Sequence, residues 1–159
     1  MGIFIYAFTA TGKTFLSKKY QNVIDMETTL YKYKNTTYED ETKKGTKREC
    51  QNKWPENYFK KLEEVKDKYD YILLSDDICN DYLHKNNYEY WWVYPNEELK
   101  QEYIYRCKNR GNNSSFIEWY EKEWNEWINS CKNDLKATKH IELQTGQYLE
   151  DVLPNLIKK

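Results

Sequence analysis

The 159-residue sequence predicts an α/β protein with three layers, α/β/α, in which a parallel sheet of five strands lies between helices. Five short apolar segments alternate with segments whose apolar residues recur at helical spacing, a pattern typical of βαβ units. No period of 20–50 residues recurs, which excludes a repeat architecture. The chain length suits one hydrophobic core, so we expect a single domain over residues 1–159.

The expected strands are short, and several end in polar or acidic residues. Residues 69–77 form an apolar run that ends in such residues, as in a parallel strand buried on both faces. Ligands of such sheets bind at the carboxyl ends of the strands, so we expect the chemistry in the loops that follow. The strands are expected at residues 3–6, 22–25, 69–77, 88–94 and 139–143.

Helices are expected between the strands, and one of them has clear signals at both ends. Asn96 can cap a helix with acidic residues in its first turn, and Gly111 suits the position after its last residue. The expected helices cover residues 15–20, a turn or two within 26–33, a segment that opens at Trp54-Pro55, residues 78–85 and 96–110, a helix that begins at Ser114 or Ser115, and a closing helix around 148–156.

Two further segments differ from the rest in composition. Residues 34–53 are polar and rich in Lys, Thr and Glu, and we expect an insertion over the acceptor side of the site. The helix after Ser115 carries an aromatic stripe that we interpret as core, because its members recur at helical spacing. The stripe consists of Phe116, Tyr120, Trp124, Trp127 and Cys131.

The most specific motif lies between the first expected strand and the first expected helix, and it ends in Gly12-Lys13-Thr14. Strand, loop, Gly-Lys-Thr and helix is the context of a phosphate-binding loop. We expect Lys13 to neutralise the β- and γ-phosphates of ATP and the Thr14 hydroxyl to bind Mg²⁺. The alternative is a surface turn with a solvated lysine. Main-chain N–H groups are expected to surround the phosphates at Phe8, Thr9, Ala10, Thr11, Gly12, Lys13 and Thr14.

The motif departs from the usual G-x-x-x-x-G-K-[ST] pattern, because Ala7 stands at the first glycine position. Glycine permits backbone angles that alanine resists. We therefore expect the chain to pass Ala7 with ordinary dihedral angles, which a methyl group permits if nothing packs against it.

Carboxylates follow the second and third expected strands. Asp25 and Glu27 form a D-x-E pair that could hold Mg²⁺ through water, accept a proton from the attacking hydroxyl, or bind a sugar hydroxyl of the acceptor. The alternative is that the pair caps the next helix. Asp76, after the third strand, is a candidate to support Mg²⁺, and the alternative for the segment from Ser75 to Asp77 is a helix N-cap.

Three of the 25 basic residues are arginines, which makes each arginine informative. Arg106 and Arg110 lie four residues apart on one expected helix face, and a guanidinium can hold phosphate oxygens at two points. We expect both to stabilise the transferring phosphoryl group, and a pairing with Glu102 is the alternative. Arg48 could hold a phosphate of the acceptor.

The composition excludes several classes of function. The net charge is −1 and lysines alternate with acids, so nothing indicates binding to nucleic acid. The four cysteines form no C-x-x-C pair, which argues against zinc and favours reduced thiols. No segment has the length of a membrane span, and the first apolar run is too short for a signal peptide, so we expect a cytoplasmic protein. The many aromatic residues could also form a homodimer interface.

With these residues assembled, the chain resembles the small nucleotide kinase-like, phosphate-loop proteins encoded by phages and prophages of low-GC Gram-positive bacteria. The resemblance implies a P-loop NTPase fold of the nucleoside monophosphate kinase type, with strand order 2-3-1-4-5, ATP as donor, and a lid at about residues 96–116. Members of that family tend to carry a serine-histidine pair where this chain has Ser75-Asp76. The resemblance rests on residues 12–14, 23–27, 54–58, 69–72, 93–111, 124–128 and 148–153.

These features together predict a Mg²⁺-dependent kinase that transfers the γ-phosphoryl group of ATP to a nucleotide, foremost a deoxynucleoside monophosphate. Such an acceptor would need a second phosphate clamp, for which Arg48 is the candidate. Two alternatives stay open. One is a kinase of a nucleoside or another hydroxyl compound, with Asp25 as the base. The other is a nucleotide-binding protein that senses or sequesters its ligand without catalysis.

Overall fold

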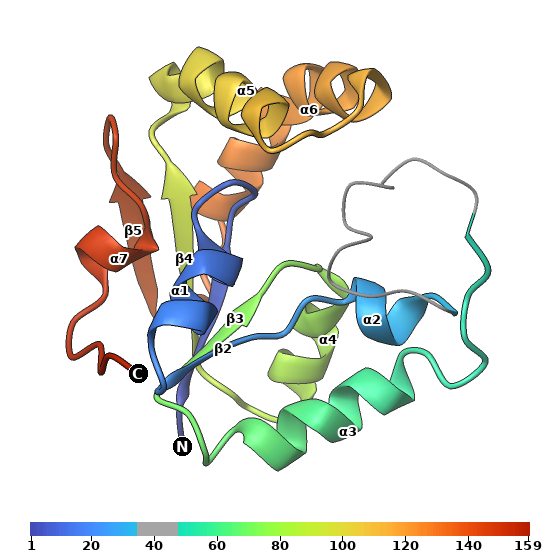
Figure 1. Ribbon diagram of the computed structural model, residues 1–159. Coiled ribbons are helices and arrows are strands. Elements are labelled where there is room, and N and C mark those ends of the chain that lie inside the picture. The colour runs from blue at the N-terminus through green and yellow to red at the C-terminus, as the bar shows by residue number, and fades with distance from the viewer. Residues whose placement is uncertain (35–47) are drawn as a thin grey trace.

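The computed structural model describes residues 1–34 and 48–159. Its centre is a five-stranded sheet in which every strand pair is parallel, in the order β2-β3-β1-β4-β5 (Figure 1). The predicted class, number of strands and strand order are confirmed. The expected insertion at 34–53 lies mostly outside the described residues. The strands are β1 (Ile3–Ala7), β2 (Val23–Asp25), β3 (Tyr71–Leu74), β4 (Tyr90–Pro95) and β5 (Lys139–Leu143).

Helices follow the strands in the order that the sequence predicts. The helix expected at residues 96–110 begins with a 3₁₀ turn and then continues as an α-helix. The helices in the described residues are α1 (Lys13–Lys19), α2 (Thr29–Lys32), α3 (Glu56–Val65), α4 (Ile78–Lys85), η2 (Glu97–Leu99), α5 (Lys100–Asn109), α6 (Ser114–Lys132) and α7 (Leu149–Val152).

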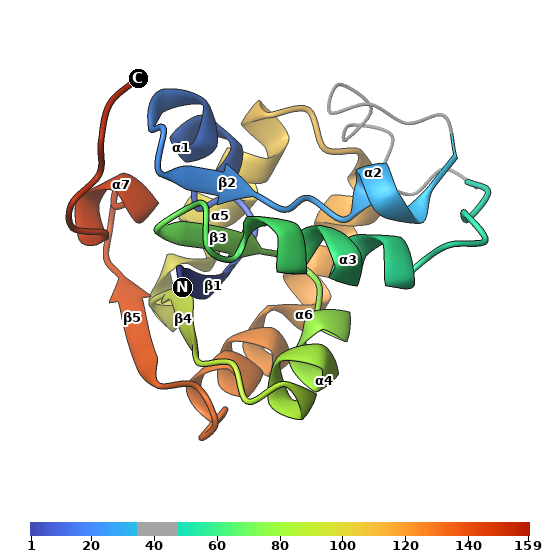
Figure 2. The same cartoon turned by 90° about the horizontal axis from the view of Figure 1, so that it is seen from below.

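Strand β1 lies in the middle of the sheet, and its side chains alternate between the two faces. Phe4 and Tyr6 belong to an apolar cluster with buried residues of α3 and α4. Ile5 and Ala7 belong to the opposite cluster, with buried residues of α1 and α7. Helices therefore cover both faces of the sheet, as Figure 2 shows, and the three-layer prediction is confirmed.

A third apolar cluster lies beyond the carboxyl end of β1 and joins α5 to α6. Phe8 is its centre, with ring centroids 4.2 Å from Trp127 and 5.5 Å from Trp124. The aromatic stripe of α6 faces this cluster, as predicted, although Phe116 and Trp127 are only partly buried. The packing fixes the position of α5 and α6 above the carboxyl edge of the sheet (Figure 1).

The ends of α5 and α6 confirm the capping signals. The Asn96 side chain accepts a hydrogen bond from the Glu98 amide at 2.9 Å. Gly111 adopts φ 89° after α5, and its amide donates to the Lys108 carbonyl at 3.0 Å, which satisfies a carbonyl at the end of the helix. None of the described helices is long and apolar enough to cross a membrane.

The fourth strand begins at Tyr90 and not at Tyr88 as expected. Asn87 adopts φ 54°, and the Tyr88 amide donates to the Leu83 carbonyl at 2.9 Å. These two residues therefore belong to the turn that ends α4. The Asn86-Asn87 pair marks this turn in the sequence, because asparagine tolerates positive φ.

Candidate functional site

The loop between β1 and α1 is closed by its own residues. The Thr11 hydroxyl donates to the Phe8 carbonyl at 2.7 Å, and Thr11 is fully buried. Gly12 adopts φ 93° and Ala10 φ 64°, so the chain reverses inside the loop, at residues 10 and 12. Ala7 pairs with Val93 inside the sheet and is not among the residues with positive φ, which confirms the expectation of ordinary dihedral angles.

Most amides of this loop make no hydrogen bond to a described backbone carbonyl. Phe8 is the exception, because its amide donates to the Val93 carbonyl at 2.9 Å and so extends the sheet. Phe8 contributes only its carbonyl to the loop interior, contrary to its expected role. Within residues 1–34 and 48–159, no backbone carbonyl accepts a hydrogen bond from the amides of Thr9, Ala10, Thr11, Gly12 and Thr14.

Lys13 lies across this loop. Its Nζ donates to the Ala7 carbonyl at 2.9 Å and to the Phe8 carbonyl at 3.2 Å. Both acceptors are neutral, and an ammonium group bonds more strongly to an anionic phosphate oxygen than to a carbonyl. The lysine is therefore positioned to exchange these carbonyls for a phosphate that enters the loop.

Thr14 and Asp25 form the pair that fits a magnesium ion. The Thr14 hydroxyl donates to Asp25 Oδ2 at 2.9 Å, and the Asp25 side chain is buried beneath α1. Mg²⁺ keeps several waters and is bound by one or two protein groups together with substrate phosphates. A hydroxyl backed by a carboxylate meets that requirement, so Thr14 would bind the ion and Asp25 would hold it through the hydroxyl or a water.

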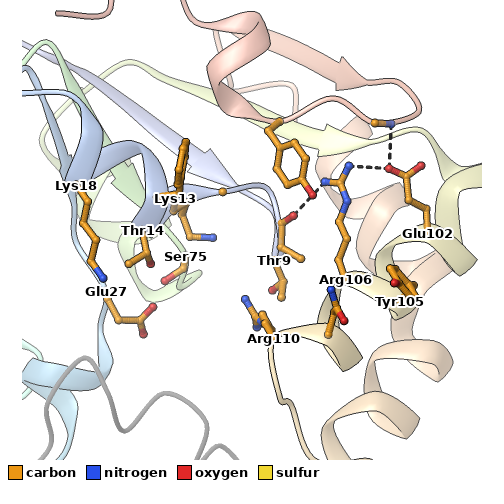
Figure 3. A pocket seen from close by; sticks show the side chains of 16 residues that line it. Thr9, Lys13, Thr14, Lys18, Glu27, Ser75, Glu102, Tyr105, Arg106 and Arg110 are labelled. Carbon is orange, nitrogen blue, oxygen red and sulfur yellow. Dashed lines mark hydrogen bonds and ion pairs between the residues drawn. The ribbon is translucent and has the colours of Figure 1, made fainter. Parts of the chain in front are cut away.

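A cavity of about 820 Å³ opens in front of this loop, and we call it the loop cavity. It is lined by the loop, α1, Glu27, Ser75, α5 and the segment before α7 (Figure 3). Glu27 projects into it beside Thr14 and Lys18, whereas Asp25 does not line it. Thr29 donates to Glu27 Oε1 from its hydroxyl at 2.7 Å, which fixes the carboxylate.

Arg106 is a structural link between three segments. Its side chain is 8% exposed, its guanidinium pairs with Glu102 at 2.6 Å, and it donates to the carbonyls of Ala10 and Gln147, each at 3.1 Å. It also lies 3.9 Å from the ring centroid of Tyr148. The structure therefore contains the Arg106–Glu102 pair that the sequence offered as the alternative. Arg106 also holds the loop in place from α5.

Arg110 has a different position, one helical turn further along α5. It is exposed, lines the loop cavity, and points toward the space between Thr9 and Glu27 (Figure 3). Its Nε donates to the Asn112 side chain, while its guanidinium lies 6.0 Å from the Phe116 ring. Of the two arginines, Arg110 is the one that can reach a bound phosphate.

A second cavity of about 860 Å³ lies next to the first, and we call it the tryptophan cavity. The ends of β1 and β3 line it together with α6 and the end of α2. Asp76 lines this cavity and not the loop cavity, and its Oδ1 accepts from the Ile78 amide at 3.1 Å. Its pKa is raised by burial, and the neighbouring Asp77 adds to the shift. Asp76 thus binds the first amide of α4, which agrees with the capping alternative, although Asp77 is the residue directly before the helix.

Arg48 is likewise apart from the loop cavity. Its guanidinium carbon lies 5.2 Å from the ring centroid of Tyr33, which lines the tryptophan cavity. The structure therefore divides the expected residues into three groups. Thr9, Ala10, Gly12, Lys13, Thr14, Glu27, Arg106 and Arg110 line the loop cavity, Phe8 and Asp76 line the tryptophan cavity, and Thr11, Asp25 and Arg48 line neither.

Sequence reasoning missed several residues of the loop cavity. Tyr148 lies against Gly12, where an added Cβ would come within 3.3 Å of its ring, and Lys18 lies one turn after Lys13 on α1. The position of Lys18 on the helix that follows the Gly-Lys-Thr sequence could have indicated it. Nothing local marks Tyr148, because the chain brings it to the loop from the other end.

Comparisons with known proteins assign neither a family nor a function to the chain. No protein-family model matches the chain, and no curated protein matches it significantly.

Proposed function

We propose that this chain is an ATP- and Mg²⁺-dependent phosphotransferase that moves the γ-phosphoryl group of ATP to a hydroxyl oxygen of a small acceptor. The observation that carries the proposal is the β1–α1 loop. Amides without backbone acceptors, a lysine held on carbonyls, and a hydroxyl backed by Asp25 converge on one cavity. Such a loop at the start of a helix binds the phosphates of nucleotides.

The side chains around the cavity supply positioning and charge, which phosphoryl transfer needs most. Bound Mg²⁺ supplies charge neutralisation on the phosphates. Lys13 moves to the β- and γ-phosphate oxygens, and Arg110 reaches the transferring group. Arg106 contacts no phosphate; it holds the loop through the Ala10 carbonyl.

Glu27 takes the role of base that the sequence analysis considered for Asp25. Its carboxylate lines the loop cavity, while the Asp25 carboxylate is engaged by Thr14. A bond forms between the acceptor oxygen and the γ-phosphorus, and the bond from that phosphorus to the bridging oxygen breaks. ADP leaves with the electron pair, and the hydroxyl proton passes to Glu27.

An ADP-release assay against all nucleosides and nucleoside monophosphates, with Mg²⁺ and with EDTA, tests this function. We expect ADP formation that depends on both an acceptor and Mg²⁺. Tight ATP binding without ADP formation across the whole panel would instead favour the sensing or sequestering protein, the alternative motivated by Ala7 and Asp76. A deoxynucleoside monophosphate would instead accept the phosphoryl group on an ionised oxygen of its own phosphate, with no hydroxyl proton to remove, and the panel separates this acceptor from a free hydroxyl compound.

A further inference from the structure

The tryptophan cavity is placed to hold the acceptor. Ser75 lines both cavities, so the two adjoin each other at the end of β3. Figure 3 shows Ser75 beside Lys13 and Thr14, near Glu27. A molecule in the tryptophan cavity can therefore present a hydroxyl group to the phosphates held in the loop cavity.

Aromatic rings form one wall of the tryptophan cavity. Trp119 and Trp127 have ring centroids 5.5 Å apart on α6, and Trp92 lines the cavity from β4. Trp119 is 47% exposed, although it lies in contact with another aromatic ring. A partly open wall of indoles suits a flat ring, because stacking on an aromatic face accepts any nucleobase.

The charge of this cavity is negative. Within the described residues, its lining contains four carboxylates, from Asp76, Asp77, Glu123 and Glu126, against the single ammonium of Lys32. Lys122 Nζ lies 3.8 Å from Glu123 Oε1, but the lysine side chain is 83% exposed and offsets little of the glutamate charge. Arg48, on the Tyr33 ring, adds one cation at the edge.

A buried polar group also faces this region. Tyr6 lines the cavity and is 1% exposed; within the described residues its hydroxyl has no nitrogen or oxygen partner, and the weakly polar Cys79 thiol lies beside it. A buried hydroxyl without a partner is costly, and a ligand that supplies one removes that cost. The hydroxyl and the carboxylates together offer hydrogen bonds to a ligand rich in N–H and O–H groups.

We propose that the acceptor is an unphosphorylated nucleoside, whose base stacks on Trp119 and Trp127 and whose amino or hydroxyl groups bind the carboxylates of the tryptophan cavity. This inference rests on the phosphotransferase function proposed above. A nucleoside monophosphate carries a dianionic phosphate, which the surplus of carboxylates repels and which Lys32 and Arg48 do not balance. The transfer is then from the γ-phosphorus of ATP to a sugar hydroxyl, with its proton passing to Glu27.

Titration calorimetry on the full chain, with Mg²⁺ and a non-hydrolysable ATP analogue present, tests the inference. Each ribo- and deoxynucleoside is compared with its own 5′-monophosphate. We expect at least one nucleoside to bind roughly tenfold more tightly than its monophosphate, and the same compound to stimulate ADP release from ATP. Binding of the monophosphates at equal or higher affinity, or no binding of any nucleoside, would overturn the inference.

Two variants on α6 give the test a control. Glu123→Gln together with Glu126→Gln should reduce the preference for nucleoside over monophosphate by roughly tenfold, because it removes two of the repelling charges. Glu121→Gln, on the same helix but lining neither cavity, should leave the preference unchanged. An unchanged preference in the double variant would contradict the charge argument.

Trp119→Ala tests the stacking surface separately. The side chain is half exposed, so its removal should leave the fold intact by circular dichroism. We expect roughly tenfold weaker nucleoside binding, with unchanged affinity for the ATP analogue. Unchanged nucleoside binding would overturn the stacking role. Failure of the ATP analogue to bind the unmodified chain would instead refute the phosphotransferase function, so the two failures are distinguishable.

Discussion

The two cavities meet at Ser75 and carry opposite charge. Among residues 1–34 and 48–159, four cationic side chains and two carboxylates line the loop cavity, whereas one lysine and four carboxylates line the tryptophan cavity. The first suits the polyphosphate of a donor, and the second repels such a group. The difference supports the proposal that an anionic donor binds on one side of Ser75 and an uncharged acceptor on the other.

Lys13→Ala should lower turnover more than any other substitution considered, because it removes the cation that lies across the loop. We expect turnover to fall roughly 10²–10³-fold, about 3 kcal/mol of transition-state stabilisation. Steady-state ADP release measures the loss. Lys18→Ala is the matched control: it also removes a cation from the loop cavity, but one turn further along α1, and should cost less. Retention of most turnover by Lys13→Ala would contradict the assigned role.

Glu27→Gln tests the proposed base, which lines the loop cavity. The substitution keeps the size of the side chain and the acceptor for Thr29, yet it removes the group that takes the proton. We expect about 10²-fold lower kcat, with unchanged affinity for the ATP analogue. Asp25→Asn should instead raise the Mg²⁺ concentration needed for activity, since Asp25 is bonded to Thr14. The opposite pattern in the two variants would reassign the base to Asp25.

The two arginines of α5 separate a role in activity from a role in stability, because they lie on the same helix and differ in burial. Arg110→Lys should lower turnover by roughly tenfold and leave the free energy of unfolding nearly unchanged, as the side chain is exposed. Arg106→Lys should lower the free energy of unfolding by about 2 kcal/mol, because a lysine cannot make the contacts to Glu102, Ala10 and Gln147 together. Urea unfolding and ADP release on both variants separate the roles.

Gly12→Ala should strain the loop itself. Gly12 has φ 93° and its added Cβ would lie 3.3 Å from Tyr148, so we expect about 1–2 kcal/mol of lost stability and weaker nucleotide binding. Gly146→Ala is the control: its φ is 73°, but nothing lies within 4 Å of the added Cβ. It should cost only the backbone strain. Equal losses in urea unfolding would show that Tyr148 does not constrain the loop.

The smallest expected effect concerns Asp76 in the tryptophan cavity. Burial raises its pKa in the folded state, so its contribution to stability is full below the unfolded value of about 3.9 and is lost as pH rises through the folded pKa. Asp76→Asn keeps an acceptor for the Ile78 amide and does not titrate. Relative to the original chain, the variant should gain on the order of 0.5 kcal/mol between pH 3 and pH 7. A rise in the Mg²⁺ concentration that this variant needs for activity would restore Asp76 as a metal ligand.

The parts of the fold that local sequence determines were predictable. The apolar run that became β3 is buried at all four positions, and Asn96 caps the turn that begins the next helix. The ends of the strands and the contacts within the site depend on residues that are far apart in the sequence, so they were not predictable. The Phe8 amide is taken by Val93, and Arg106 is held by the Ala10 and Gln147 carbonyls. No local pattern encodes such pairs.

The candidate site was likewise predictable only where it depends on neighbouring residues in the sequence. The Gly12-Lys13-Thr14 sequence predicted a loop between β1 and α1 with Lys13 beside it, because both depend on local geometry. The tryptophan cavity was not predicted. Trp127 was interpreted as core and Trp119 was not considered, since the cavity forms only where α6 comes to face the end of β3.

A crystal structure of the full chain with Mg²⁺ and a non-hydrolysable ATP analogue tests the central claim most directly. We predict that the phosphates lie against the amides of residues 9–14, and that Lys13 Nζ has left the Ala7 and Phe8 carbonyls for a phosphate oxygen. An analogue bound elsewhere, with Lys13 still on those two carbonyls, would contradict the account.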